Sequence, residues 1–380
     1  MKHVSRIAAL ILAVLVFCTG CGSSVAPDKY KTTVAATYGD QTTYLDEANF
    51  WMRLNQWGTE SYTGVMYRYY YGITDIWPIA SGVRTQTFEQ TLKENTMAEI
   101  LQTYILLEHA GDYASSALTD SDNEKIAALI ADIRDGYADE FFTLAGVADG
   151  EAGDAQMKAY FEKRVQAYKV ARAVMDQAQV SVKDEDCKSF RIAYILVPEE
   201  KETTTESTAS TEGSTSSSDP VGEALANVIR SNLVAGKTWE ETKEAWKDLT
   251  SNEVTYAYTE ESSSIFFTEG KDMKTGDSKV SYREGTGWYV LYCVSDDDAE
   301  GAKTRRATLE SEQQTEHFNG VYKTWQDAAK AFKVAKEFKN LTVESAYVAK
   351  TTTAAPTTAA PSTAAPESTE AATTAAVVDK

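Results

Sequence analysis

Two tyrosines lie inside short apolar segments that have the composition of buried strands. Tyr194 belongs to Ser189-Phe-Arg-Ile-Ala-Tyr-Ile-Leu-Val197, and Tyr289 belongs to Gly287-Trp-Tyr-Val-Leu-Tyr-Cys-Val294. β-Branched and aromatic runs bounded by charged and turn-forming residues favour strands. In an antiparallel pairing the two side chains would face each other. A phenolic hydroxyl both donates and accepts hydrogen bonds, and its ordinary pKa is near 10, so the pair could carry a hydrogen-bonding network.

The three histidines of the sequence lie away from these segments. His3 is close to the N-terminus, and His109 and His317 fall in stretches whose patterns predict helices. None of them can therefore act beside Tyr194 and Tyr289.

Other patterns of reactive or metal-binding residues are absent from the sequence. There is no phosphate-binding loop, no Cys/His spacing typical of a metal site and no Ser/His/Asp arrangement. Asp296, Asp297 and Asp298 with Glu300 form an acidic run that could bind a cation, although such runs are usually solvated turns. We expect neither a metal site nor a bound cofactor.

The two apolar segments resemble the opening and closing strands of the parvulin prolyl isomerases. The first is similar to that family's Arg-Ala-Ser-His-Ile-Leu-Val pattern, and the second is similar to Gly-Tyr-His-Ile-Ile. In the family each strand contributes one histidine, and the two histidines meet behind the proline pocket. Tyr194 and Tyr289 stand at those positions, so the resemblance implies a parvulin-like domain with a degenerate catalytic site.

The same resemblance marks two candidates for lining a proline pocket. Phe266 and Met273 lie in a stretch similar to the family's Phe…Leu-x-x-Gly-Glu segment, and core packing is the alternative reading of both. The family's glycine-rich strand is missing, and a stretch that begins at Tyr256 stands there instead. Prolyl isomerisation needs an apolar pocket and a polar network that favours the twisted amide. Both departures therefore argue against catalysis.

The order of the segments resembles the SurA/PrsA class of exported foldases. The matching stretches are Val34 to Thr43 before a helix, Leu-Thr-Asp-Ser-Asp-Asn-Glu at 118–124 and Val-Ser-Val-Lys-Asp-Glu-Asp at 180–186. This resemblance implies that a helical chaperone region surrounds an inserted isomerase-like domain. It also implies that a C-terminal helix folds back on the N-terminal helices.

Hydrophobic spacing predicts the main helices of this region. One helix runs over 88–108, and Ser121 with Glu124 opens another. After the second apolar strand, a long amphipathic helix carries Leu309 and Phe318 and extends to Phe332.

The N-terminus has the features of a targeting segment. Basic residues precede an apolar stretch, Ile7 to Phe17, which is too short to span a membrane comfortably. The following Cys18-Thr-Gly-Cys21-Gly-Ser-Ser resembles a bacterial lipobox, which implies cleavage before Cys21 and lipidation of its thiol, although Cys18 replaces the usual leucine. The alternative is ordinary secretion with a free Cys21 thiol.

Charge and cysteine content limit the possible partners. The formal net charge of −20 argues against binding to nucleic acid or anionic lipid. Beyond Cys21, only Cys187 and Cys293 remain, and they form either a disulfide or two buried free thiols.

We therefore expect an α+β protein with a mostly helical chaperone domain and an inserted small antiparallel sheet. Low-complexity stretches mark a tether, an insertion and a tail that cannot form a core. The predicted organisation is a signal peptide at 1–20, a lipidated tether at 21–33, a helical chaperone region at 34–186, a parvulin-like domain at 187–299 with a disordered insertion at 201–219, a C-terminal helix at 300–347 and a Thr/Ala/Pro-rich tail at 348–380.

Aromatic residues of the helical region are candidates for a surface that binds unfolded clients. Trp51, Trp57, Tyr69 and Trp77 are the candidates, because Tyr and Trp supply contact area at low entropic cost. The alternative is that these rings pack on the helical core.

The leading functional prediction is a lipid-anchored chaperone or foldase at the outer face of a bacterial cytoplasmic membrane. Its partners would be unfolded or nascent secreted polypeptides, with no nucleic acid. One alternative is an active prolyl isomerase, which would accelerate proline-limited refolding at substoichiometric amounts. A second alternative is a solute-binding or adhesion lipoprotein, which a tight small ligand would reveal, although the two-lobed α/β alternation of solute-binding proteins is absent from the sequence.

Overall fold

The computed structural model describes residues 26–82, 85–199 and 220–343, which fall into two compact units. Unit 1 runs through Leu101, includes Thr119–Glu162 and resumes at Ala331, whereas unit 2 comprises Gln102–Leu118 and Lys163–Lys330. Helices and two small antiparallel sheets make up the described chain, so the predicted α+β class is confirmed. The predicted signal peptide, Cys21, the 201–219 insertion and the 348–380 tail lie outside the described residues.

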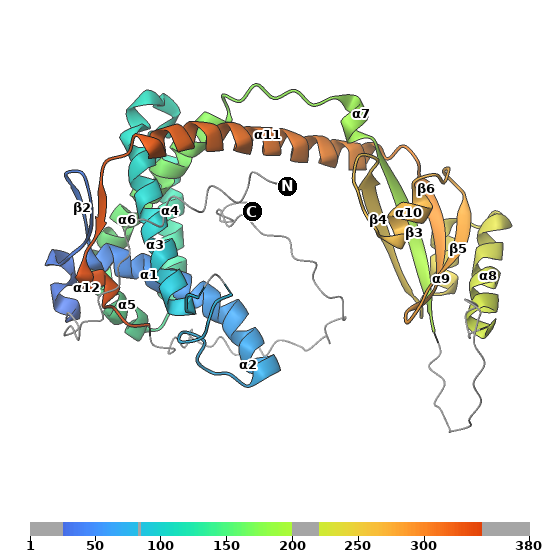
Figure 1. Ribbon diagram of the computed structural model, residues 1–380, viewed down its shortest axis with the longest axis horizontal. Helices are drawn as coiled ribbons and strands as arrows, with labels where there is room; N and C mark the ends of the chain where they lie inside the picture. The colour runs from blue at the N-terminus through green and yellow to red at the C-terminus, as the bar shows by residue number, and fades with distance from the viewer. Residues whose placement is uncertain (1–25, 83–84, 200–219, 344–380) are drawn as a thin grey trace. The chain divides into compact units, whose positions relative to one another are not determined.

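The sheet of unit 1 joins the two ends of the described chain. Strands β1 (Val34–Tyr38) and β2 (Gln41–Tyr44) form a hairpin, and β7 (Phe332–Val334) pairs antiparallel with β1 (Figure 1). The hairpin turn uses Gly39, whose φ of +55° lies in the left-handed region that favours glycine. The chain leaves unit 1 twice, at Gln102–Leu118 and at Lys163–Lys330, and returns to it each time.

Helices make up the rest of unit 1. Two of them, α3 and α6, begin in unit 1 and end in unit 2. The helical elements that lie in or begin in unit 1 are η3 (Pro27–Thr32), α1 (Leu45–Thr59), a π-helical turn (Glu60–Gly64), α2 (Val65–Tyr71), α3 (Phe88–Glu108), α4 (Asp120–Gly136), α5 (Asp139–Ala145), α6 (Gly150–Met175) and α12 (Lys336–Lys339).

Aromatic packing around α1 forms the core of unit 1. The ring of Phe50 is fully buried and contacts the rings of Phe141, Tyr160 and Phe161 at centroid distances of 5.5–6.3 Å. The guanidinium of Arg53 is also buried, and it donates a 2.9 Å hydrogen bond to the carbonyl of Thr342. A buried charge needs such partners, so this contact fixes the returning chain to α1.

A four-stranded antiparallel sheet, in the order β4-β3-β6-β5, is the centre of unit 2. Its strands are β3 (Ser189–Pro198), β4 (Thr250–Ala257), β5 (Ser278–Arg283) and β6 (Gly287–Ser295), and its helices are α8 (Pro220–Val234), α9 (Trp239–Ala245) and α10 (Ile265–Gly270). Helices α8 and α9 cover one face, while α10 packs on the other face, beside β3 and β6. The two predicted apolar strands are the central pair of this sheet.

The other helical elements of unit 2 are the end of α3, η5 (Ala110–Asp112), η6 (Ala114–Ser116), the end of α6, α7 (Asp184–Cys187) and α11 (Ala299–Asp327). The ends of α3 and α6, with η5 and α11, share a separate core. Leu106 of α3, Val170 and Val174 of α6 and Phe318 of α11 are buried against one another. The long predicted helix is therefore present, but it ends at Asp327, and Phe332 belongs to β7.

The start of α11 is fixed to the sheet by Asp298, a member of the acidic run. Its carboxylate is buried and accepts a 3.3 Å hydrogen bond from the Thr255 hydroxyl, and its backbone N–H donates to the Ser189 carbonyl at 2.8 Å. Gly301 allows this contact, because a Cβ there would lie 2.5 Å from the Thr255 methyl group. Asp298 is therefore a structural residue, not part of a solvated turn.

Both remaining cysteines are free, so the two-thiol reading is the correct one. Cys187 and Cys293 are buried, and Cys293 pairs with Ile192 across the sheet, five residues along the chain from Cys187. Burial raises the pKa of the Cys293 thiol to about 11, which keeps this thiol protonated at neutral pH. No helix within the described ranges is long and apolar enough to cross a membrane.

Asp296 closes the loop between α10 and β5. Its carboxylate accepts a 2.6 Å hydrogen bond from the Thr275 hydroxyl, and the Lys274 ammonium lies 3.2 Å away. The Thr275 hydroxyl in turn accepts a 3.0 Å hydrogen bond from the Asp296 backbone N–H. These hydrogen bonds from Thr275 and Lys274 hold the pKa of Asp296 at about 2, well below its ordinary value.

The lowered pKa predicts a contribution to acid sensitivity. The stability that comes from the ionised Asp296 is present above about pH 4 and is lost as the pH falls through about 2. We expect Asp296→Asn to be less stable at neutral pH and to lose less stability between these pH values. Urea unfolding at several pH values measures this, with Asp297→Asn at the exposed neighbour as the control. Parallel pH profiles for wild type and Asp296→Asn would contradict the assignment.

Candidate aromatic binding site

Three aromatic rings meet on the sheet face that carries α10. The ring of Phe266 stacks on that of Tyr194 with centroids 4.4 Å apart, and it meets Tyr289 edge-on at 5.2 Å. The two tyrosine rings contact each other at 5.5 Å, also edge-on. Tyr289 is buried, whereas Tyr194 and Phe266 are half-buried and leave part of their rings at the surface. We call these three residues the aromatic site.

The strand register corrects the predicted relation between the tyrosines. Tyr194 pairs with Leu291, and Tyr289 pairs with Leu196, so the tyrosines are diagonal neighbours and not direct cross-strand partners. Diagonal positions lie on the same face of a sheet and are within reach of aromatic side chains. The register therefore brings the rings together but offsets their hydroxyls along the strands.

The predicted hydrogen-bonding network of these tyrosines is not found. Neither phenolic hydroxyl makes a hydrogen bond to a residue within the described ranges, and neither is a buried atom without a partner. The hydroxyls are therefore reached by solvent, and the pair interacts through its rings. Burial raises the pKa of Tyr289, with an opposing contribution from Arg283, so its hydroxyl stays protonated at neutral pH.

Local sequence explains how α10 brings Phe266 to the site. The hydroxyl of Ser264 accepts hydrogen bonds from the Phe266 N–H at 3.3 Å and from the Tyr256 hydroxyl at 2.9 Å, which caps α10 and ties it to β4. At the other end, Gly270 approaches β3 so closely that a Cβ would lie 2.5 Å from the Ile192 side chain. The helix can therefore lie flat on the sheet, with Phe266 over Tyr194.

The two predicted pocket residues have different surroundings. Phe266 is part of the aromatic site, whereas Met273 is buried in the core beneath it. Sequence reasoning did not select Leu196, Val254 and Ile265, which are half-buried on the same face and widen its apolar area. Alternation along the strands would have placed Leu196 with Tyr194, but Ile265 depends on the position of α10.

This arrangement can bind but has few means to catalyse. Ring faces accept apolar side chains, including the prolyl ring, through contacts that need no proton transfer. The core beneath the site includes the Cys293 thiol, which is buried and has a raised pKa. In the described part of the chain, no three acidic, histidine or cysteine side chains are placed to hold a metal ion.

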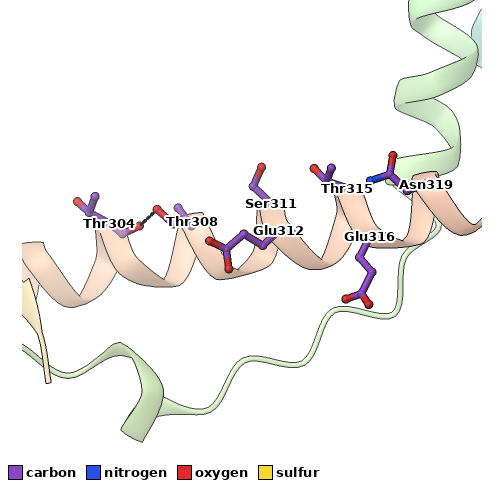
Figure 2. Close-up of a pocket in the computed structure, with 8 residues that line it drawn as sticks. Thr304, Thr308, Ser311, Glu312, Thr315, Glu316 and Asn319 are labelled. Carbon is purple, nitrogen blue, oxygen red and sulfur yellow. Dashed lines mark hydrogen bonds between the residues drawn. The ribbon is translucent and has the colours of Figure 1, made fainter. Parts of the chain in front are cut away.

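A shallow hollow along α11 is not a competing site. Its lining comes from one helix alone, and the Thr308 hydroxyl donates to the Thr304 carbonyl of the same helix at 3.1 Å (Figure 2). The lining residues are Thr304, Ala307, Thr308, Ser311, Glu312, Thr315, Glu316 and Asn319. Among the described residues, only α11 lines this hollow. It is therefore an exposed polar helix face, without a second wall to hold a ligand.

The candidate client-binding aromatics fall into two groups. Trp51 and Trp77 are buried, with exposed fractions of 7% and 1%, so they are core residues and not surface contacts. Trp51 packs on Phe161 at 5.2 Å because both lie on the apolar faces of their helices. Trp57 and Tyr69 are exposed and keep the predicted accessibility, with Tyr69 the more exposed at 77%.

Comparison with solved structures returns foldases of the predicted class. The peptidylprolyl isomerase PrsA of Bacillus anthracis is 15% identical, with 61% of this chain and 96% of that chain covered and a TM-score of 0.25. The foldase PrsA of Lactococcus lactis is 10% identical over 80% of this chain and 95% of the other, with a TM-score of 0.30. A SurA-like chaperone from a study of Campylobacter jejuni PEB4 and Cj1289 is 10% identical over 80% and 100% of the two chains, at 0.26.

No family model matches the sequence, and no curated protein matches it. The structures found are of the SurA/PrsA class that the sequence resembles. TM-scores of this size carry no argument about function, so the function has to be inferred from the residues and their contacts.

The close approach at Gly270 predicts a sensitive position. We expect Gly270→Ala to destabilise unit 2 by about 1–3 kcal/mol, the usual cost of overpacking, because Ile192 and Phe190 would have to move. Urea unfolding gives the free energy of unfolding. The control is Gly320→Ala in α11, where no atom lies within 4 Å of the new Cβ, and we expect it to be neutral or stabilising. Equal stability of Gly270→Ala and wild type would mean that α10 is free to shift.

Proposed function

We propose that this chain is a chaperone that holds unfolded segments of exported polypeptides, and that its parvulin-like sheet binds such segments without isomerising them. The observation that carries the proposal is the aromatic site. Tyr194 and Tyr289 stand where the resemblance implies a polar pair of histidines. Instead, they contact each other and Phe266 through their rings.

A prolyl isomerase must stabilise the twisted amide of an X–Pro bond. Rotation about an X–Pro bond has a barrier of roughly 18–20 kcal/mol, and catalysis requires polar groups aimed at the twisted amide. Tyr194 and Tyr289 make no hydrogen bond within the described ranges that would orient their hydroxyls for this task. Half-buried rings still offer an apolar surface for client side chains, so binding is retained where catalysis is lost.

Two assays on one client distinguish a binding site from an enzyme. We expect the protein to suppress aggregation of an unfolded client at stoichiometric amounts and to leave proline-limited refolding unchanged at substoichiometric amounts. Phe266→Ala should weaken binding of an unfolded peptide roughly 2- to 10-fold, the size of one aromatic contact. The control is Tyr168→Ala, an exposed tyrosine of α6 that is not part of the aromatic site.

The double variant Tyr194→His/Tyr289→His tests the degenerate site directly. We expect a folded protein without a large gain in refolding catalysis. The two substitutions leave the diagonal register unchanged and do not supply the glycine-rich strand that helps to shape the pocket in the family. Catalysis by the wild-type protein, or a large gain in this variant, would overturn the proposal in favour of an isomerase.

We also propose that the protein is anchored to the outer face of the membrane through a lipid on Cys21. The lipobox-like stretch supports this, and residue 21 lies outside the described ranges. We expect Cys21→Ser to move the protein from the membrane fraction to the medium, while Cys18→Ser leaves it at the membrane. Immunoblots of the two fractions measure the distribution. Membrane retention of Cys21→Ser would exclude this anchor.

A further inference from the structure

Helix α2 and the π-helical turn before it expose a cluster of apolar and aromatic side chains in unit 1. Four tyrosines have exposed fractions between 61% and 77%, and two aliphatic residues add to them. We call these residues the tyrosine surface: Tyr62, Val65, Met66, Tyr69, Tyr70 and Tyr71.

This degree of exposure is unusual for a helix of such composition. Six of the seven residues of α2 are apolar or aromatic, yet the helix buries none of them. A helix that is apolar on all sides is normally buried, and contiguous exposed apolar patches mark interaction sites. The composition of α2 therefore indicates that a partner covers it.

The base of the tyrosine surface is well anchored, so its exposure is not a frayed end. The Trp77 indole donates a 2.7 Å hydrogen bond to the Glu60 carboxylate, in the π-helical turn, and Trp77 itself is buried. The ring of Tyr67 meets Phe88 edge-on at 5.6 Å, which joins α2 to the start of α3. The helix ends at Tyr71, and the following Gly72, with a φ of +67°, caps it in the left-handed conformation.

Charge identifies the class of partner. Arg68 is the one charged residue of α2, and within the boundaries of unit 1 the sequence has 25 Asp and Glu against 16 Lys and Arg. Such an excess of acid repels an anionic membrane, and it also disfavours a second copy of the same unit. It attracts cationic chains, and tyrosine faces bind Lys and Arg through cation–π contacts as well as apolar side chains through their rings.

We propose that the tyrosine surface binds extended polypeptide segments in which Lys or Arg residues alternate with apolar residues. This inference rests on the proposed chaperone function and specifies the clients that it holds. The exposed rings take the apolar side chains and the alkyl stems of the basic ones, while the net negative charge of unit 1 favours the cationic groups. Basic, unfolded segments are therefore preferred over acidic ones of equal hydrophobicity.

The test uses the full chain and three labelled, unstructured peptides with identical apolar residues and with Lys, Ser or Glu at the alternating positions. Fluorescence anisotropy gives the Kd of each. We expect the Lys peptide to bind about tenfold or more tightly than the Glu peptide, with affinity falling as salt rises. A fourfold variant, Tyr62→Ser/Tyr69→Ser/Tyr70→Ser/Tyr71→Ser, removes several aromatic contacts together. We expect it to bind the Lys peptide about tenfold or more weakly than wild type, which means a higher Kd.

Three controls separate binding from folding. Tyr168→Ser removes an exposed tyrosine from another helix and should bind like wild type. The fourfold variant should keep its circular dichroism and its unfolding midpoint, since all four side chains are exposed. A second variant, with Phe at the same four positions, should keep most of the affinity because the rings remain.

The outcomes separate this inference from the chaperone function. Equal affinity for the Lys and Glu peptides would overturn the charge preference, and unchanged binding by the fourfold Ser variant would overturn the surface. Binding of anionic vesicles, or self-association that the Ser variant abolishes, would also overturn the inference by identifying another occupant. If the wild-type protein suppresses client aggregation in these cases, the chaperone function stands without this surface. If it does not, the chaperone function itself fails.

Discussion

The antiparallel pairing of β3 with β6 is the constraint on which unit 2 depends. These two strands occupy the middle of the sheet, so side chains on both faces are buried, and any slip of one residue would exchange the two faces. On one face, Ala193, Ile195 and Val290 pack beneath α8 and α9. On the other face, the same register places Tyr194 and Tyr289 where both contact Phe266 of α10.

The character of the aromatic site follows from this register and from the close approach of α10. Diagonal tyrosines bring their rings together without aligning their hydroxyls, and Phe266 fills the space between and above them. The site therefore has the hydrophobic contacts of a binding pocket but lacks an oriented polar pair. This difference is the basis of the proposal that the site binds without isomerising, because function depends on the residues of the site.

The two aromatic surfaces of the chain differ in how they are supported. Tyr194 and Tyr289 lie on a sheet that is buried on both faces, so their positions are fixed by a large core. The tyrosine surface lies on the π-helical turn that carries Tyr62 and on the seven-residue helix α2, which buries none of its own side chains. In the proposals made above, the first takes a defined side chain in a defined place, whereas the second contacts extended segments in which basic and apolar residues alternate. Both tasks suit a protein that holds unfolded segments.

Local patterns determined much of the secondary structure, because helix periodicity and strand composition act over short distances. The helix predicted over 88–108 begins and ends at those residues, and both apolar strands are present. The predicted N-terminal cap of α4 was wrong, because Thr119 and not Ser121 caps this helix. Neighbouring polar residues compete for the capping position, and the local pattern does not choose between them. The prediction of a long helix to Phe332 failed because pairing with β1 draws that residue into a sheet.

The sequence by itself determined the class of fold and the strand that carries each tyrosine. Only the tertiary structure decided that Trp51 and Trp77 are buried while Tyr69 is exposed, because burial depends on which helices pack together. It also decided that Tyr194 and Tyr289 meet through their rings and not through their hydroxyls. That outcome depends on strand register and on the seating of α10 at Gly270, which are long-range contacts that no local pattern encodes.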